Sequence, residues 1–178
     1  MGFAIVGYFD EVSDVKIKKM WKLMADSGID DYLIHSGNNP HFKLDMYNAI
    51  DIGTVKKELE KFARSTAKIK LHFKKFGFYP NKDTPFLTLD IAENAEVITL
   101  QQTIHNQFAG TGQENTGGYF SAGIWKPDIQ LTVPFDKDKL TLAVSLLNNL
   151  ELPFEGTLQS IGLIEFPPVK QLFRIDLY

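Results

Sequence analysis

Residues 40–46 have the sequence Pro-His-Phe-Lys-Leu-Asp-Met, in which polar and apolar side chains alternate after the proline. An alternation of period two is typical of a half-buried β-strand, because successive side chains point to opposite faces of a sheet. The pattern therefore predicts a strand with one apolar face toward the core. That face would carry Phe42, Leu44 and Met46, and the other face His41, Lys43 and Asp45.

The layout of this strand recurs later in the chain. Residues 127–131, Pro-Asp-Ile-Gln-Leu, repeat residues 40–44 at an offset of 87 positions (128 − 41). The same offset relates Val55 to Leu142, Leu59 to Leu146 and 70–72 to 157–159, and after one deletion 87–91 match 173–177. Matches in register across several elements predict an internal duplication. We expect a single domain, residues 1–178, made of two pseudo-symmetric halves at about 1–91 and 92–178.

Hydrophobic periodicity predicts the other elements, so that each half runs strand, helix, strand, turn, strand. We expect strands at 3–9, 32–35, 68–76 and 84–91, helices from Asp10 or Ser13 to about Ser27, at 51–66 and at 94–108, and a mobile loop at 110–118. The predicted fold class is α+β. It is an internally duplicated, two-lobed fold with two antiparallel sheets around a central cleft and helices on the outer faces.

An approximate two-fold axis would bring the two equivalent strands close together at the centre. Their polar faces would then oppose each other, with His41, Lys43 and Asp45 on one side and Asp128, Gln130 and Thr132 on the other. A cleft lined by convergent polar groups is the usual place for a ligand. The sequence therefore predicts the functional site between these strands.

The two motifs, in a duplicated α+β chain, resemble the paired motifs of the 2H phosphoesterase superfamily. That superfamily includes the bacterial 2′-5′ RNA ligase-like proteins and the cyclic nucleotide phosphodiesterases. Its pattern is His-x-Thr/Ser-x twice, each usually preceded by Pro and followed by an apolar residue, and the order of elements resembles it along nearly the whole chain. The resemblance implies acid/base chemistry without metal or cofactor on a 2′,3′-cyclic phosphate or a 2′-5′ linkage. The expected ligand is a nucleotide or an RNA end.

Three of the four motif positions depart from this pattern. His41 stands where the first histidine belongs, whereas Lys43 and Gln130 replace the two hydroxyl residues and Asp128 replaces the second histidine. The resemblance implies catalytic roles for His41 and Asp128, and contacts of Lys43 and Gln130 with the phosphoryl oxygens. An ordinary Asp, with a pKa of about 3.9, is ionised at pH 7 and is a poor general acid unless burial raises that pKa.

Three functions therefore stay open at this point. The chain could be a divergent phosphoesterase, or a catalytically inactive module that binds a nucleotide or another small ligand in the cleft. A protein-interaction domain would instead fill the cleft with its own side chains.

The other three histidines are candidates to replace the missing one. His35 ends a predicted strand just before the first motif, where it could point into the cleft. His72 shares a strand face with Lys68, Lys70 and Lys74, which is either a basic strip along a nucleic-acid backbone or a solvated face. His105 is expected at the surface of its helix.

Two aromatic residues flank the predicted loop before the second motif. Trp125 and Tyr119 could stack on a base of the ligand, and the alternative for both is packing in the core or the loop.

Composition narrows the class of protein. The 178 residues are 44% hydrophobic, carry a formal net charge of −3 and include no cysteine, which excludes thiol nucleophiles, disulfides and cysteine zinc sites. Residues 1–10 lack the pattern of a signal peptide, and no run of about 18 apolar residues could span a bilayer. We expect a cytoplasmic monomer with no membrane segment.

Overall fold

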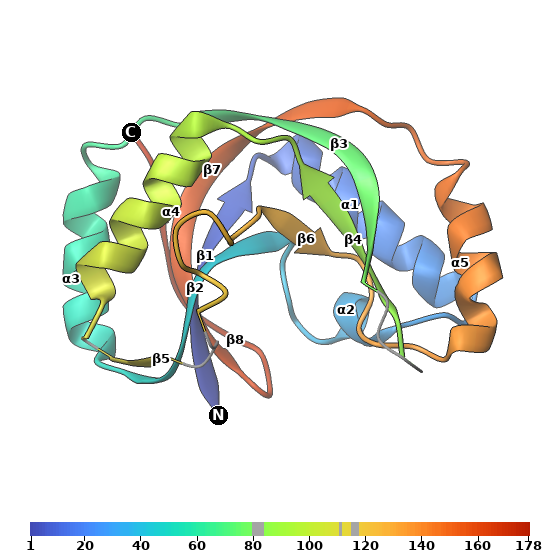
Figure 1. Ribbon diagram of the computed structural model, residues 1–178, viewed down its shortest axis with the longest axis horizontal. Helices are drawn as coiled ribbons and strands as arrows, with labels where there is room; N and C mark the ends of the chain where they lie inside the picture. The colour runs from blue at the N-terminus through green and yellow to red at the C-terminus, as the bar shows by residue number, and fades with distance from the viewer. Residues whose placement is uncertain (80–83, 111, 115–117) are drawn as a thin grey trace.

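One antiparallel sheet runs through the molecule and bends around its centre (Figure 1). The computed structural model describes residues 1–79, 84–110, 112–114 and 118–178. Within these ranges eight strands are hydrogen-bonded in the order β5-β2-β1-β7-β3-β4-β6, and β8 pairs with β7. The strands are β1 Gly2–Phe9, β2 His41–Ile50, β3 Ile69–Tyr79, β4 Phe86–Ile91, β5 Gly112–Glu114, β6 Asp128–Gln130, β7 Phe154–Phe166 and β8 Lys170–Asp176.

The long strand β7 connects two lobes. Its residues 158–166 pair with β1, and its residues 154–158 pair with β3. The two antiparallel sheets expected from the sequence are therefore lobes of one continuous sheet, because β7 is long enough to pair in both. Each lobe also mixes strands of the two predicted halves: β1 and β2 join β7 and β8, whereas β3 and β4 join β6. The internal duplication itself stays a prediction.

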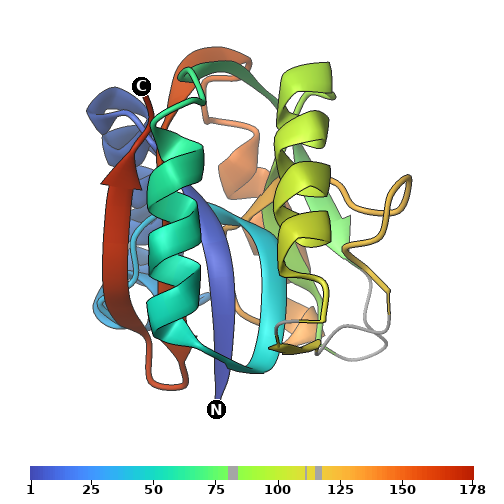
Figure 2. The ribbon, with the colours of Figure 1, turned by 90° about the vertical axis from the view of Figure 1, so that its left-hand side faces the viewer.

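Helices cover the outer sides of both lobes (Figures 1 and 2). α3 and α4 lie next to each other over one lobe, and α1 and α5 lie on the side of the other. The helices are α1 Glu11–Asp26, α2 Tyr32–His35, α3 Ile52–Ala63, α4 Ala95–Phe108 and α5 Leu140–Leu147, with a 3-10 turn, η1, at Lys137–Lys139. In the part of the chain that the structure describes, no helix is long and apolar enough to cross a membrane.

The first predicted helix is confirmed, including its start. Asp10 is the N-cap of α1, and its carboxylate accepts a hydrogen bond of 2.9 Å from the backbone N–H of Ser13. This bond satisfies one of the free N–H groups of the first turn. The buried stripe of the helix consists of Ser13, Ile17, Met20, Trp21 and Met24.

Two local predictions are wrong. Residues 32–35 form the short helix α2 instead of a strand, since a run of four apolar and aromatic residues does not distinguish the two by its period. In the expected loop at 110–118, residues 112–114 form β5 and pair with β2. Residues 111 and 115–117 of that loop lie outside the described residues.

Candidate functional site

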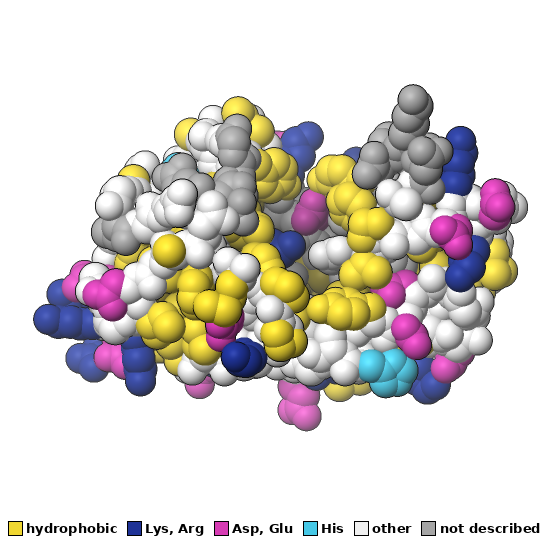
Figure 3. Space-filling view, turned by 90° about the horizontal axis from the view of Figure 1, so that it is seen from below, with side chains coloured by type: hydrophobic (Ala, Val, Ile, Leu, Met, Phe, Trp, Pro, Cys, Tyr) yellow, Lys and Arg dark blue, Asp and Glu magenta, His cyan; other side chains and the backbone are white. Residues whose placement is uncertain are grey.

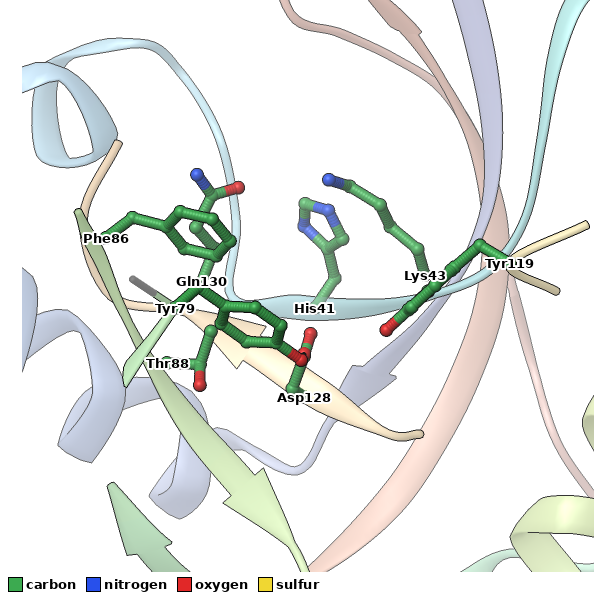
Figure 4. A pocket seen from close by; sticks show the side chains of 8 residues that line it. All are labelled: His41, Lys43, Tyr79, Phe86, Thr88, Tyr119, Asp128 and Gln130. Atoms are coloured by element: carbon green, nitrogen blue, oxygen red, sulfur yellow. The ribbon is translucent and has the colours of Figure 1, made fainter. Parts of the chain in front are cut away.

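The two motif strands lie in contact at the centre of the molecule, and a cleft opens over them. Its volume is about 310 Å³. Figure 3 shows the hollow from its open side, bordered by hydrophobic side chains. Of the residues that the structure describes, eight line the cleft and are drawn in Figure 4: His41, Lys43, Tyr79, Phe86, Thr88, Tyr119, Asp128 and Gln130. The structure therefore brings together His41, Lys43, Asp128 and Gln130, as the sequence predicted.

His41, the first residue of β2, is held in one tautomer. Its Nδ1 lies 2.7 Å from the backbone oxygen of Asn39. Because a carbonyl oxygen only accepts, Nδ1 must carry the proton, and Nε2 keeps its lone pair when the ring is neutral. Lys18 of α1 donates to the Asn39 side chain at 3.2 Å and so helps to fix the segment that orients the ring.

His41 is neutral at physiological pH. Burial lowers the pKa of its imidazole to about 4, the hydrogen bond to Asn39 opposes this shift, and the Lys43 ammonium adds to it. A group with this pKa is unprotonated at pH 7. It can take up a proton as a base, and it cannot donate one as an imidazolium.

Lys43 extends from β2 into the same cleft (Figure 4). Burial lowers the pKa of its ammonium, and the Asp128 carboxylate opposes this shift. The backbone under Lys43 is fixed from the core, since the indole N–H of Trp125 donates to its carbonyl oxygen at 2.9 Å. Trp125 itself is buried, packs on Phe42 with ring centroids 6.1 Å apart, and does not line the cleft. Trp125 therefore has the core-packing position that the sequence left open for it beside a ligand contact.

Asp128 opens β6 and has a tyrosine partner. The Tyr79 hydroxyl donates to its carboxylate at 2.7 Å. Burial raises the pKa of Asp128, the Tyr79 hydrogen bond lowers it, the nearby Asp90 carboxylate raises it, and Lys43 lowers it. Burial and then the Asp128 carboxylate raise the pKa of the Tyr79 phenol, which therefore stays protonated and keeps donating.

Gln130 and Thr88 face each other across the pair β4–β6, where they are partners in register. The side chain of Gln130 lines the cleft, while its backbone oxygen accepts the indole N–H of Trp21 at 3.0 Å. Thr88 is 1% exposed, and its hydroxyl donates to Asp90 at 3.0 Å. The cleft thus contains an amide and a hydroxyl beside the charged groups.

Two polar residues expected on the cleft face have turned away from it. A β-bulge interrupts the pairing of β1 and β2 between Lys43 and Asp45, so Asp45 pairs with Ile5 on the helix-covered face. Thr132 lies beyond the end of β6, where its buried hydroxyl accepts the backbone N–H of Leu87 at 2.9 Å.

Asp45 and His105 form a buried pair on that opposite face. Asp45 is 1% exposed and accepts hydrogen bonds from Tyr47 at 2.7 Å and from Nδ1 of His105 at 2.8 Å. The His105 side chain is only 20% exposed, so its expected surface position is wrong. The sequence analysis assigned His105 to solvent because it is a polar residue on a helix. In the structure Asp45 lies beneath it and is its hydrogen-bond partner.

The remaining two histidines do not supply a second cleft imidazole. His35 is in α2, and its Nδ1 lies 2.9 Å from the backbone oxygen of Asp31, away from the residues that line the cleft. His72 is 56% exposed on β3, beside Glu155 at 3.5 Å. The suggestion that His35 points into the cleft is therefore wrong, and His41 is the one histidine of the four that lines it.

Three of the lining residues were not proposed as ligand contacts from the sequence: Tyr79 of β3, and Phe86 and Thr88 of β4. Tyr119, which the sequence suggested as a residue that could stack on a base, also lines the cleft. The alternation within 84–91 shows that Phe86 and Thr88 share a face, but only the pairing of β4 with β6 shows which face that is. Among the described residues, no group of three or more His, Asp or Glu side chains could hold a metal ion.

Comparison with known proteins gives structural matches alone. No model of a protein family matches the sequence, and no curated protein matches it. The crystal structure of TT0787 of Thermus thermophilus matches with a TM-score of 0.64, at 14% identity over 99% of this chain and 98% of that chain. LigT of E. coli, complexed with 3′-AMP, gives a TM-score of 0.63 at 13% identity, with 98% and 97% covered. Usb1 of Kluyveromyces marxianus with uridine monophosphate gives 0.51 at 11%, with 99% and 96% covered.

The chain shares its fold with TT0787, LigT and a phosphoesterase of known structure. The fold expected from the resemblance of the paired motifs at 40–44 and 127–131 is thereby confirmed. Identities of 11–14% show the fold alone, so the chemistry of this chain has to be argued from its own cleft.

Proposed function

We propose that the chain is a divergent 2H-type phosphoesterase that hydrolyses a cyclic phosphate or an oligoribonucleotide end by acid/base chemistry without a metal. The observation that carries this proposal is the state of His41: a neutral imidazole, oriented by Asn39, with a basic Nε2 in a cleft that also contains Lys43, Gln130 and Asp128. LigT and Usb1, which share the fold, are known with 3′-AMP and uridine monophosphate, which supports a nucleotide as the ligand.

In the proposed reaction a water molecule attacks the phosphorus of a 2′,3′-cyclic phosphate. Nε2 of His41 takes a proton from the water as its oxygen forms the new bond to phosphorus. The bond from phosphorus to one ribose oxygen breaks, and that oxygen takes the proton of a protonated Asp128. Lys43 and Gln130 donate to the non-bridging oxygens, where negative charge grows. Proton exchange with water then returns His41 to its neutral form and Asp128 to its acid form.

Asp128 can act as the acid only in the fraction of molecules that carry its proton. Burial and the Asp90 carboxylate raise its pKa, which enlarges that fraction, whereas Tyr79 and Lys43 reduce it. The proposed enzyme therefore works best below neutral pH, between the pKa of His41 and that of Asp128.

A binding module without catalysis is the second candidate, and the Tyr79 hydrogen bond favours it. A hydroxyl that donates to Asp128, together with a nearby ammonium, stabilises the carboxylate form. In that form Asp128 cannot protonate a leaving oxygen. The cleft would then hold a nucleotide through Lys43 and Gln130 without turning it over.

Hydrolysis of a 2′,3′-cyclic nucleotide by purified protein separates the two candidates. The enzyme hypothesis predicts turnover at mildly acidic pH that falls by about 10²- to 10⁴-fold in His41→Ala, the usual contribution of one acid/base group. His35→Ala is the matched control, because His35 lies outside the cleft, and circular dichroism checks that both variants fold. Binding of the cyclic nucleotide with no turnover at any pH would favour the module, and full activity in His41→Ala would exclude His41 as the base.

A further inference from the structure

A second pocket opens directly beside the cleft and has an apolar lining. It shares His41, Lys43 and Gln130 with the cleft, so the two spaces adjoin at the proposed phosphate site. Its volume is about 230 Å³. Apolar side chains of α1, α2, the segment after β6 and the β7–β8 hairpin form its walls, among them Trp21, Leu33, Val133, Ile164 and Phe166. Figure 3, seen from the side of the hairpin and α2, shows hydrophobic side chains gathered around the hollow.

Apart from Tyr32 and Asn38, the described polar residues that line this pocket are the three that it shares with the cleft, His41, Lys43 and Gln130. The Trp21 indole N–H donates to the Gln130 carbonyl oxygen at 3.0 Å, and the Asn38 side-chain oxygen accepts from the backbone N–H of Asn39 at 3.0 Å. A nucleobase has several polar atoms along its edge, and burial without partners costs each of them free energy. The lining therefore fits a group that needs no hydrogen bonds.

We propose that this pocket binds an apolar aryl or branched alkyl substituent of a phosphate ester whose phosphoryl group lies against His41, Lys43 and Gln130. The inference rests on the proposed function for the position of the phosphate, and it extends the range of ligands beyond ribonucleotides. An apolar cavity of about 150 Å³ holds a benzene molecule. The larger volume here has room for a fused two-ring group, and burial of the second ring would tighten binding.

Titration calorimetry with four probes tests the pocket: inorganic phosphate, phenyl phosphate, 1-naphthyl phosphate and 3′-AMP. The Lys43→Ala variant measures how far binding of inorganic phosphate depends on Lys43. We expect 1-naphthyl phosphate to bind about five- to tenfold more tightly than phenyl phosphate. Val169→Trp, in the turn of the β7–β8 hairpin, should fill the pocket and abolish this preference while the affinity for inorganic phosphate stays unchanged. Val144→Trp is the matched control, since Val144 is an exposed valine of α5 that does not line the pocket.

The outcomes separate this inference from the proposed function. The pocket assignment is wrong if the two aryl phosphates bind equally tightly, or if Val169→Trp still prefers 1-naphthyl phosphate to phenyl phosphate. This holds even if binding of inorganic phosphate depends on Lys43. If Val169→Trp removes the preference for 1-naphthyl phosphate but phosphate binding does not depend on Lys43, the result supports the pocket and counts against the phosphate site. If Val169→Trp weakens 3′-AMP more than 1-naphthyl phosphate, the occupant is a nucleobase and the apolar assignment is wrong.

Discussion

His41 and Asp128 occupy equivalent places at the start of β2 and of β6, yet their surroundings differ. β2 is a ten-residue strand with β1 on one side and β5 on the other, whereas β6 has three residues and pairs with β4. His41 is oriented by a backbone carbonyl, and Asp128 by the side chain of Tyr79. The first motif is thus fixed by the main chain, and the second by groups that a single substitution can remove.

Burial acts on both groups in favour of their neutral forms. It lowers the pKa of the His41 imidazole and raises the pKa of the Asp128 carboxyl, because a charge is less stable away from water. A neutral base and a neutral acid can therefore coexist over a range of pH. In this respect the Asp at the second motif is compatible with acid/base catalysis.

The largest effect is expected from changing the second motif. Asp128→Asn removes the proposed proton donor and should lower turnover of a 2′,3′-cyclic nucleotide by about 10²- to 10⁴-fold. Asp128→His places another proton donor at the same position and should therefore retain more turnover than Asp128→Asn. Steady-state kinetics of both variants checks this. Equal activity of Asp128→Asn and wild type would exclude Asp128 as the acid.

The pH profile of the wild-type protein tests the assignment of base and acid. The reactive form has an unprotonated His41, so kcat/KM should fall about tenfold per pH unit below a pKa of about 4. It also has a protonated Asp128, so kcat/KM should fall on the alkaline side of the raised Asp128 pKa. The maximum should lie on the acid side of neutral. A rate that stays flat from there to pH 9 would contradict the role of Asp128.

A contrast between two aspartates predicts a smaller effect, on stability. Asp45 lies on the helix side of β2 with His105 as a partner at 2.8 Å, whereas Asp128 lies in the cleft. His105→Ala would leave a buried carboxylate with one hydrogen bond fewer, and should lower the free energy of unfolding by about 1–3 kcal/mol. Urea denaturation measures this loss, with His72→Ala, at an exposed site, as control. Phosphate binding in the folded variant should not change, and a selective loss of binding would argue against a structural role.

The sequence was sufficient for the parts of this site that depend on local pattern. Period-two alternation placed His41 and Lys43 on one face of a strand, and the repeat at 127–131 placed Asp128 and Gln130 opposite them. Alternation failed at Asp45, because the bulge after Lys43 shifts every later residue of β2 to the other face. No local signal marks such a bulge in this stretch.

The other features of the site depend on pairing between strands that are far apart in the sequence. Tyr79 reaches Asp128 because β3 pairs with β4 and β4 with β6, and these long-range pairings leave no trace in the spacing of residues. The same holds for the continuous sheet, in which β7 pairs with both β1 and β3. For Trp125 the sequence left two positions open, because a large aromatic residue beside a loop can pack in the core or contact a ligand. Its burial and its hydrogen bond to the Lys43 carbonyl oxygen place it in the core.

The smallest predicted effect concerns Tyr79. It tests how much the Tyr79 hydrogen bond changes the pKa of Asp128 in the second motif. Its hydrogen bond lowers the pKa of Asp128, so Tyr79→Phe should raise that pKa and move the alkaline limb of the pH profile to higher pH. At neutral pH a larger fraction of Asp128 would then carry a proton, and turnover should rise a few-fold, whereas the acid limb set by His41 should stay near pH 4. Tyr32→Phe is the control, because Tyr32 lines the neighbouring pocket and not the cleft. If the alkaline limb moves to lower pH in Tyr79→Phe, the Tyr79 hydroxyl stabilises the protonated form of Asp128. Its hydrogen bond would then raise the pKa of Asp128 and not lower it.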